Sequence, residues 1–296
     1  MIYVTHGTVA CHDENRISHA LMLPEPLLMR HLESRCEKYV PLAEAIQGKG
    51  DAFTVDDASR AGLRAVLLAR QYGHAACWFV NGAHLATSMD YFPFLISWML
   101  DETRKHQCVF DGARWDLTDN AGRRRLRLRT KELYMKMKSY AQIRDLLGKL
   151  SGCLNTETSA LDPSLQTVTA AEVAQAVAAG VELGNHCWTH LNPRNFSPRA
   201  LAFDLELNGE FLSGFCDFDS RTFAPPYGNP VSLPDGSADF MLLANKNPMP
   251  FHSRCRTINR RELKIADLVE RTQPKMDMTT SFECIAKVQP DVPVFL

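Results

Sequence analysis

The sequence has no long hydrophobic run, no low-complexity segment and no excess of charge of one sign. Its 296 residues include 33 lysines and arginines against 34 aspartates and glutamates, so the formal net charge is 33 − 34 = −1. This balance excludes a globally basic nucleic-acid binder, although a local basic patch stays open. The most apolar stretch, around residues 92–100, is far shorter than the ~20 residues of a membrane-spanning helix, so we expect no transmembrane segment.

Paired cysteines and an export signal are also missing. Nine cysteines are scattered along the chain, and no two of them form a CxxC pair. The opening residues become polar too soon for a signal peptide. Scattered thiols without such a signal favour a reducing compartment. We therefore interpret the cysteines as free, small apolar side chains and expect a cytoplasmic protein.

The length suits either one large α/β barrel of roughly 250 residues or two domains. Residues 52–80 favour a parallel sheet. An apolar strand at 52–55 is followed by a helix that begins after Ser59 and ends near Gly73, and then by an apolar run at 75–80. This unit of about thirty residues has the length of a βαβ crossover.

The α/β pattern is interrupted between residues 91 and 165. This region contains a strongly basic run at 123–138, with five Arg and three Lys against one Glu, and helical periodicity beyond it. We interpret it as a mostly helical insertion. The α/β pattern resumes at Thr169, which with Glu172 has the spacing of a capping box.

Three motifs that each follow a predicted strand carry reactive side chains. Asp56 and Asp57 can divide cation binding and proton transfer, or one can simply cap the next helix. His186 and His190 suit a divalent metal, or are two structural histidines. An aspartate with two histidines forms a set of three ligands with open positions for water and substrate. Residues 223–228, FAPPYG, form a rigid turn that lets backbone approach a ligand, or an ordinary surface turn.

In this order, the motifs resemble those of the NodB-homology polysaccharide deacetylases, carbohydrate esterase family 4. TVDDA at 54–58 is similar to the family's TFDDG motif, and NHCWTH at 185–190 to its [SN]H[ST]xxH motif. FAPPYG is similar to the third motif, RPPYG. YGHAACWFV at 72–80 and AGVELGNH at 179–186 are similar to the framework segments YGIPATFFV and AGHEIGNH.

The resemblance implies an α/β fold, a distorted and incomplete (β/α) barrel of the NodB type. We expect a single deacetylase domain over residues 1–296 with an insertion at about 91–165. By the same resemblance Asp57, His186 and His190 are metal ligands, Asp56 is the general base, and the backbone N–H of Tyr227 is the oxyanion donor. Zn²⁺ is the expected metal, and Co²⁺, Ni²⁺ or Fe²⁺ suit the same ligands.

Two departures from the family pattern leave roles open. Many members have an arginine that pairs with the base at the position of Ala224, so a different orientation of Asp56 is expected here. Arg221 is not at the matching position. The general acid is either His252 or His6, and His252 could instead be a surface residue.

The leading hypothesis is a metal-dependent N-deacetylase that removes an acetyl or similar acyl group from an amino sugar in polysaccharide or glycoconjugate biosynthesis. The alternatives are a related amidohydrolase acting on a non-sugar amide or cyclic ureide, and a catalytically silent carbohydrate-binding relative. The basic run is either a solvated face or a surface for an anionic membrane or an N-acetylated sugar linked to phosphate or a lipid carrier. No nucleic-acid partner is expected, because no stacking aromatics accompany the run.

Overall fold

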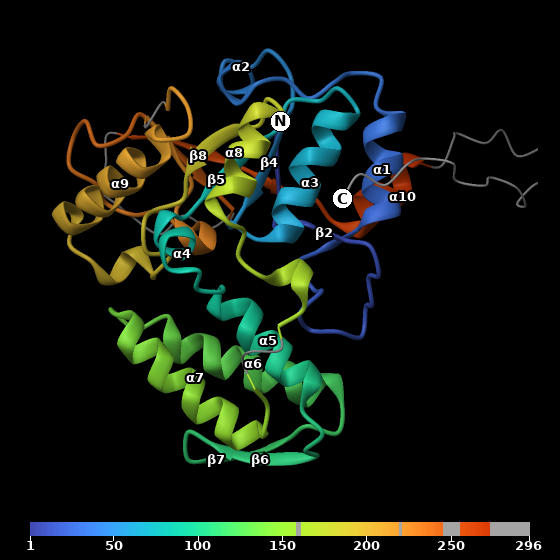
Figure 1. Ribbon diagram of the computed structural model, residues 1–296, viewed down its shortest axis with the longest axis vertical. Coiled ribbons are helices and arrows are strands. Elements are labelled where there is room, and N and C mark those ends of the chain that lie inside the picture. Colours follow the sequence, from blue (N-terminus) through green and yellow to red (C-terminus); the bar gives the residue numbers. More distant parts are fainter. Residues whose placement is uncertain (158–160, 219–220, 245–254, 273–296) are drawn as a thin grey trace, which may run out of the picture.

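The computed structural model describes residues 1–157, 161–218, 221–244 and 255–272, with side chains described as far as Leu268 (Figure 1). Its centre is a parallel eight-stranded sheet with the order β11-β10-β9-β8-β5-β4-β1-β12. The strands are β1 (Ile2–Thr5), β4 (Ala52–Asp56), β5 (Cys77–Val80), β8 (Glu182–Asn185), β9 (Thr222–Phe223), β10 (Phe240–Leu243), β11 (Arg256–Asn259) and β12 (Arg261–Glu262).

The sheet nearly closes into a barrel because its two outermost strands come from one short segment. β11 and β12 are consecutive in the chain, with only Arg260 between them. β11 pairs with the outer edge of β10, and β12 pairs with the outer edge of β1. The expected distorted, incomplete (β/α) barrel is confirmed, and residues 256–262 form its closing segment.

Helices follow the strands where the sequence provides caps. Ser59 Oγ accepts a hydrogen bond from the backbone N–H of Gly62 at 3.0 Å and begins α3 (Arg60–Gln71). Thr169 and Glu172 form the predicted capping box at the start of α8 (Ala170–Ala178). The other helices around the barrel are α1 (Glu25–Ser34), α2 (Leu42–Ile46), α4 (Gly82–Thr87), α9 (Pro198–Ser213) and α10 (Ile265–Thr272).

The interruption between β5 and β8 forms a lobe that lies below the barrel in Figure 1. It contains α5 (Phe92–Glu102), the antiparallel pair β6 (Gln107–Phe110) and β7 (Ala113–Asp116), α6 (Asn120–Tyr134) and α7 (Tyr140–Leu154). The hairpin is an addition to the mostly helical segment that we expected. Asp111 and Gly112 both have positive φ at its turn, as a tight Asp-Gly hairpin requires.

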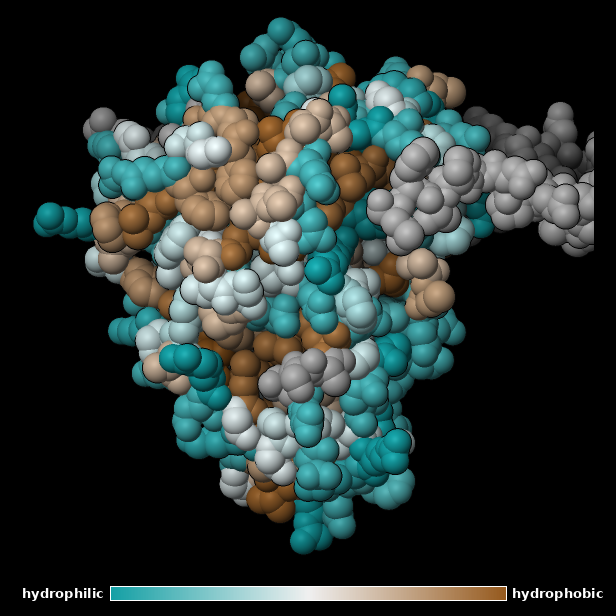
Figure 2. Space-filling model, in the orientation of Figure 1, coloured by the Kyte–Doolittle hydropathy of each residue, from teal (hydrophilic) through white to brown (hydrophobic). Residues whose placement is uncertain are grey.

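α5 packs against both α6 and α7 and joins the lobe to the barrel. Its Phe92 and Ile96 are almost fully buried in the same apolar core as the barrel residues Val55 and Trp78. Figure 2 shows the outer surface of the lobe as largely hydrophilic, with apolar residues gathered in the band where lobe and barrel meet. The lobe is therefore packed onto the barrel through a shared core.

The remaining short elements are β2 (Thr8–Val9), β3 (Leu23–Pro24) and the 3-10 turns η2 (Pro163–Leu165), η3 (Pro193–Asn195) and η4 (Pro226–Gly228). Within the described ranges, no helix is both long and apolar enough to cross a membrane. The eight cysteines in these ranges are free thiols, as we expected from their scattered positions.

Candidate metal and catalytic site

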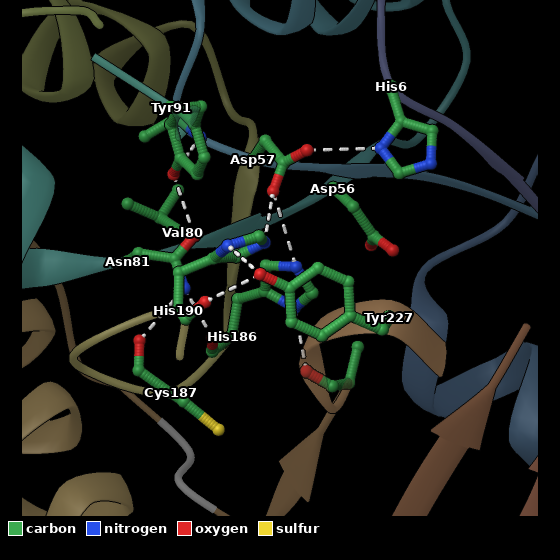
Figure 3. Close-up of polar contacts among 12 residues, drawn as sticks. His6, Asp56, Asp57, Val80, Asn81, Tyr91, His186, Cys187, His190 and Tyr227 are labelled. Carbon is green, nitrogen blue, oxygen red and sulfur yellow. Dashed lines mark hydrogen bonds and ion pairs between the residues drawn. The ribbon is translucent and has the colours of Figure 1, made fainter. Parts of the chain in front are cut away.

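The three motifs meet at the carboxyl ends of neighbouring strands. Asp56 is the last residue of β4, His186 directly follows β8, and Tyr227 lies in η4 after β9. Because these strands run parallel in one sheet, with β5 between β4 and β8, their ends lie at the same rim of the barrel. The side chains of Asp57, His186 and His190 are buried there, with His6 and Tyr227 beside them (Figure 3).

Unusual backbone conformations concentrate at this rim. Four of the seven non-glycine residues with positive φ in the described chain belong to the motifs. They are Asp57 (71°), Cys187 (65°), His190 (51°) and Tyr227 (65°). Such conformations are unfavourable for residues with a Cβ and persist where the surrounding fold enforces them, most often at functional sites.

Asp57, His186 and His190 converge on one point. The Nε2 atoms of His186 and His190 lie 3.4 Å and 2.9 Å from Asp57 Oδ1. One ligand atom from each residue lies within 4.8 Å of the other two. Asp57 Oδ1 is buried and has no hydrogen-bond partner of acceptable geometry, so it is an acceptor without a donor.

The hydrogen bonds around these residues suit a divalent metal. His186 Nδ1 donates to the carbonyl oxygen of Ala224 at 2.7 Å, which leaves the lone pair of Nε2 directed at Asp57. Asp57 Oδ2 pairs with His6 Nδ1 at 3.1 Å, which leaves Oδ1 for the metal. One carboxylate and two neutral imidazoles with open positions are the ligand set of a catalytic zinc-type site. Asp57, His186 and His190 therefore fit a divalent metal.

The protonation states agree with this donor set. Burial opposes ionisation of Asp57, but its interactions with His190, His186 and His6 hold its pKa well below the usual range. Burial, together with the nearby His186 and His6, lowers the pKa of His190 although Asp57 raises it. An ionised carboxylate beside a neutral imidazole is the state in which both residues can bind a cation.

Asp56 is held by an arginine that the sequence motifs do not contain. Arg260, between β11 and β12, donates from Nη1 to Asp56 Oδ1 at 2.6 Å and from Nη2 to Oδ2 at 2.7 Å. Its side chain is fully buried. Although burial would raise the pKa of Asp56, the charge of Arg260 lowers it, so the carboxylate is ionised.

This ion pair changes the expectation that we drew from Ala224. The arginine that the family motif has at that position is supplied here from the closing segment of the barrel. Ala224 packs instead in an apolar cluster with Phe79 and Leu242. The alanine was the signal that a compensating cation is needed, but the sequence offers no pattern that singles out Arg260.

The structure places Tyr227 and His6 at the site but does not describe His252. The hydroxyl of Tyr227 donates to the carbonyl of His190 at 3.1 Å, and its ring packs against the His190 imidazole. The role of its backbone N–H as an oxyanion donor stays a prediction. His6 lies at the site, 28% exposed and bonded to Asp57, whereas His252 falls outside the described residues.

A buried chain of hydrogen bonds, which we did not predict from the sequence, connects the loops that follow β4 and β8. The hydroxyl of Tyr91 accepts from the backbone N–H of Ala58 at 2.6 Å and donates to Asn81 Oδ1 at 2.6 Å. Asn81 Nδ2 in turn donates to the carbonyls of His186 and Cys187. This chain of bonds ties the loop after β4 to the loop after β8, so it fixes Asp57 relative to His186 (Figure 3).

The site opens into a cavity of about 230 Å³. Asp56, Asp57, His186, His190 and Tyr227 form one side of it. The opposite side comes from the inserted lobe, through the side chains of Pro93, Phe94, Arg127, Lys131 and Tyr134. The lobe is therefore part of the site.

The basic side chains of the run at 123–138 that belong to α6 lie on different faces of the helix and make different contacts. Arg123 donates to the backbone carbonyls of Leu117 and Asp101, and Arg129 pairs with Asp111 and Glu132. These contacts are structural. Of the run, only Arg127, Lys131 and Tyr134 line the cavity together with Asp57, His186 and His190.

Comparison with known proteins agrees with the fold and the motifs. The family profile described as polysaccharide deacetylase matches residues 130–245, which include His186, His190 and Tyr227. No curated protein matches the sequence.

Among solved structures, the deacetylase PplD of Streptococcus pyogenes in complex with acetate has a TM-score of 0.53 at 10% identity, over 92% of this chain and 97% of its own. IcaB from Ammonifex degensii has a TM-score of 0.48 at 12% identity, over 92% and 95%. The de-N-acetylase from Aggregatibacter actinomycetemcomitans has a TM-score of 0.49 at 12% identity, over 91% and 98%.

The first of these likenesses shows the fold, and the family profile covers two of the three motifs. The remaining motif, at Asp56 and Asp57, lies beside the other two at the same rim of the barrel. Residues 130–245 therefore match the polysaccharide deacetylase family, and the described chain shares the fold of a solved deacetylase.

Proposed function

We propose that the protein is a metal-dependent N-deacetylase that removes an acetyl or similar acyl group from an amino sugar in polysaccharide or glycoconjugate biosynthesis. The observation that carries the proposal is the unpartnered Asp57 Oδ1 facing His186 and His190, with the Asp56–Arg260 pair in the same cavity. We treat residues 1–296 as one domain with an insertion at about 91–165. The α6 side chains in the cavity support that view.

Asp57, His186 and His190 would hold the metal, with Zn²⁺ as the first candidate. Bound there, a divalent metal supplies Lewis acidity toward the acyl carbonyl and toward water. The residues around it divide the remaining work. Asp56 accepts the proton of the attacking water as general base. Arg260 keeps the Asp56 carboxylate ionised and fixes its plane by two hydrogen bonds.

The negative charge that develops on the acyl oxygen needs a hydrogen-bond donor in addition to the metal. We assign this role to the backbone N–H of Tyr227, whose positive φ sets the direction of its peptide group. The amine that leaves must be protonated, and His6 is a described candidate at the cavity wall. The location that we propose is the cytoplasm, where a reducing compartment would keep the free cysteines reduced.

The test is acetate release by the Zn²⁺-loaded protein from a panel of N-acetylated sugars, with ring opening of cyclic ureides as a parallel assay. We expect acetate release, and we expect Asp56→Asn to lower kcat by about 10²–10⁴-fold without loss of bound metal. Ring opening without acetate release would favour the related amidohydrolase. Metal binding without either activity would favour the silent carbohydrate-binding relative.

A further inference from the structure

One face of α6 forms the wall of the cavity opposite the metal ligands. Arg127, Lys131 and Tyr134 follow the i, i+4, i+7 spacing that places side chains on one side of a helix. All three line the cavity together with Asp57 and His190. The wall therefore presents two cations to whatever the site binds.

Arg127 is anchored in a way that leaves its outer edge available. Its Nε donates to Ser97 Oγ at 2.7 Å, and that hydroxyl donates to the carbonyl of Pro93 at 2.7 Å. The guanidinium is thus oriented from behind, by a neutral group. Burial lowers the pKa of Arg127, which shows that the charge is partly withdrawn from water.

Neither cation has an acidic partner in the described part of the chain. Arg129, on another face of the same helix, pairs with Asp111 and Glu132, but no carboxylate forms an ion pair with Arg127 or Lys131. Two cations four residues apart repel each other. A bound anion would remove this repulsion. The two side chains line the same cavity as the proposed metal ligands, so an anionic group on the substrate could reach them.

A second cavity lies beside α6. It has a volume of about 460 Å³ and shares Arg127 with the catalytic cavity. Arg124 and Leu128 of α6 line it on one side, and Ile17 and Ile265 line it on another. Its lining, which also includes Glu14, Arg16 and two histidines, offers room for a group attached beyond the anion.

We propose that Arg127 and Lys131 form a subsite for a phosphoryl group on the amino sugar, so that the preferred substrate is a phosphate-linked N-acetylated sugar. The planar edge of an arginine and the point charge of a lysine together suit the oxygens of a phosphoryl dianion. The carrier beyond the phosphoryl group then extends along α6 into the second cavity. This inference rests on the proposed deacetylase function.

The kinetic test compares two matched substrates, N-acetylglucosamine 1-phosphate and the neutral methyl N-acetylglucosaminide. We expect the Zn²⁺-loaded wild type to have a kcat/KM at least ten times higher for the phosphorylated sugar. Arg127→Gln and Lys131→Gln should each lower that preference about tenfold. Arg125→Gln, an exposed position on the same helix, is the matched control and should keep it. Equal kcat/KM values for the two substrates would overturn the proposal, as would an equal preference for a carboxylated sugar.

Binding of inorganic pyrophosphate to the metal-loaded protein, measured by calorimetry, separates this inference from the proposed function. We expect Arg127→Gln and Lys131→Gln to weaken binding about tenfold and Arg125→Gln to leave it unchanged. That result without acetate release would sustain the subsite and refute the deacetylase. Acetate release with unchanged pyrophosphate binding in all variants would refute the subsite alone. Nucleoside-diphosphate-linked and polyprenyl-phosphate-linked N-acetylglucosamine then identify the carrier, since the better substrate is the one that fills the second cavity.

Discussion

Arg260 and Asp56 form a buried two-point ion pair across 204 positions of sequence. The carboxylate belongs to the first motif, and the arginine belongs to the segment that closes the barrel. The proposed base is therefore held by a residue that reaches it only when the sheet is complete.

Arg260→Gln should lower both activity and stability. Removal of one partner of a buried ion pair leaves the other charge uncompensated, which costs about 3–5 kcal/mol. We expect kcat to fall about 100-fold or more, because an Asp56 without its cation is less readily ionised and less well oriented. Acetate-release kinetics and urea unfolding measure the two effects. Arg261→Gln is the control, since Arg261 is exposed and pairs with Asp267.

The second variant in this test places the family's arginine back at its usual position. Arg260→Ala combined with Ala224→Arg should recover part of the activity that Arg260→Ala loses, because both positions lie beside the Phe79 ring. Arg260→Gln with kcat within twofold of the wild type would refute the positioning role.

Removal of the metal should abolish activity and destabilise the fold. A ligand that binds only the folded state at about 1,000 times its Kd stabilises by ~4 kcal/mol. We therefore expect a chelator to lower the Tm by roughly 10 °C, and Zn²⁺ to restore it. His190→Ala should show neither bound metal nor a chelator-dependent shift, whereas the exposed His106→Ala should behave as the wild type. A wild-type Tm that is indifferent to chelator would contradict the metal site.

Gly82 tests the packing behind the second motif. A Cβ at this position would lie 2.2 Å from the ring of Trp188, which stands between His186 and His190 in the chain, and 2.9 Å from Phe211. Gly82→Ala should therefore cost about 1–3 kcal/mol of unfolding free energy and weaken metal binding.

Gly148 gives the matched control for this substitution. It lies inside α7, and a Cβ there meets nothing within 4 Å. Gly148→Ala should stabilise the protein by about 0.5–1 kcal/mol, because alanine is the better helix former. Urea unfolding of the two variants gives opposite signs if the steric argument holds.

His74 should make stability depend on pH on the acidic side of neutrality. It is buried, its Nδ1 accepts from the backbone N–H of Tyr39 at 3.0 Å, and its Nε2 donates to the carbonyl of Leu32 at 2.7 Å. Burial and the nearby charges of Lys38 and Arg35 lower its pKa in the folded state. A proton on Nδ1 would have to face the N–H of Tyr39.

The unfolded chain accepts this proton near pH ~6.5, while the folded chain does so only at lower pH. The free energy of unfolding should therefore fall as the pH drops from about 6.5 toward the folded pKa. His74→Gln should have a smaller slope between pH 7 and pH 5 than the wild type or His106→Gln. Identical slopes for all three proteins would refute this assignment.

Local interactions made much of this fold predictable. The cap at Ser59, the capping box at Thr169 and the alternation of apolar strands with helices depend on residues close in sequence, and the structure confirms them. The grouping of Asp57 with His186 was also expected, because equivalent ends of parallel strands meet at one rim. Their roles as ligands stay predictions until metal is measured.

What sequence could not predict depends on distant contacts. The ion pair of Arg260 with Asp56 is set by closure of the barrel, and no local pattern marks it. The same is true of α6, whose basic run is uniform in sequence but divides in space between Arg123, which bonds to carbonyls, and Arg127, which lines the site. The general acid is still open between His6 and His252.

The closing segment at 256–262 also covers two strand edges of the sheet. Until it docks, β1 and β10 each have an outer edge of unpaired N–H and C=O groups, which can recruit a strand from another molecule. The same seven residues include Arg260, the cation that pairs with Asp56, the proposed base. Coverage of the two sheet edges and orientation of Asp56 therefore depend on the same short segment.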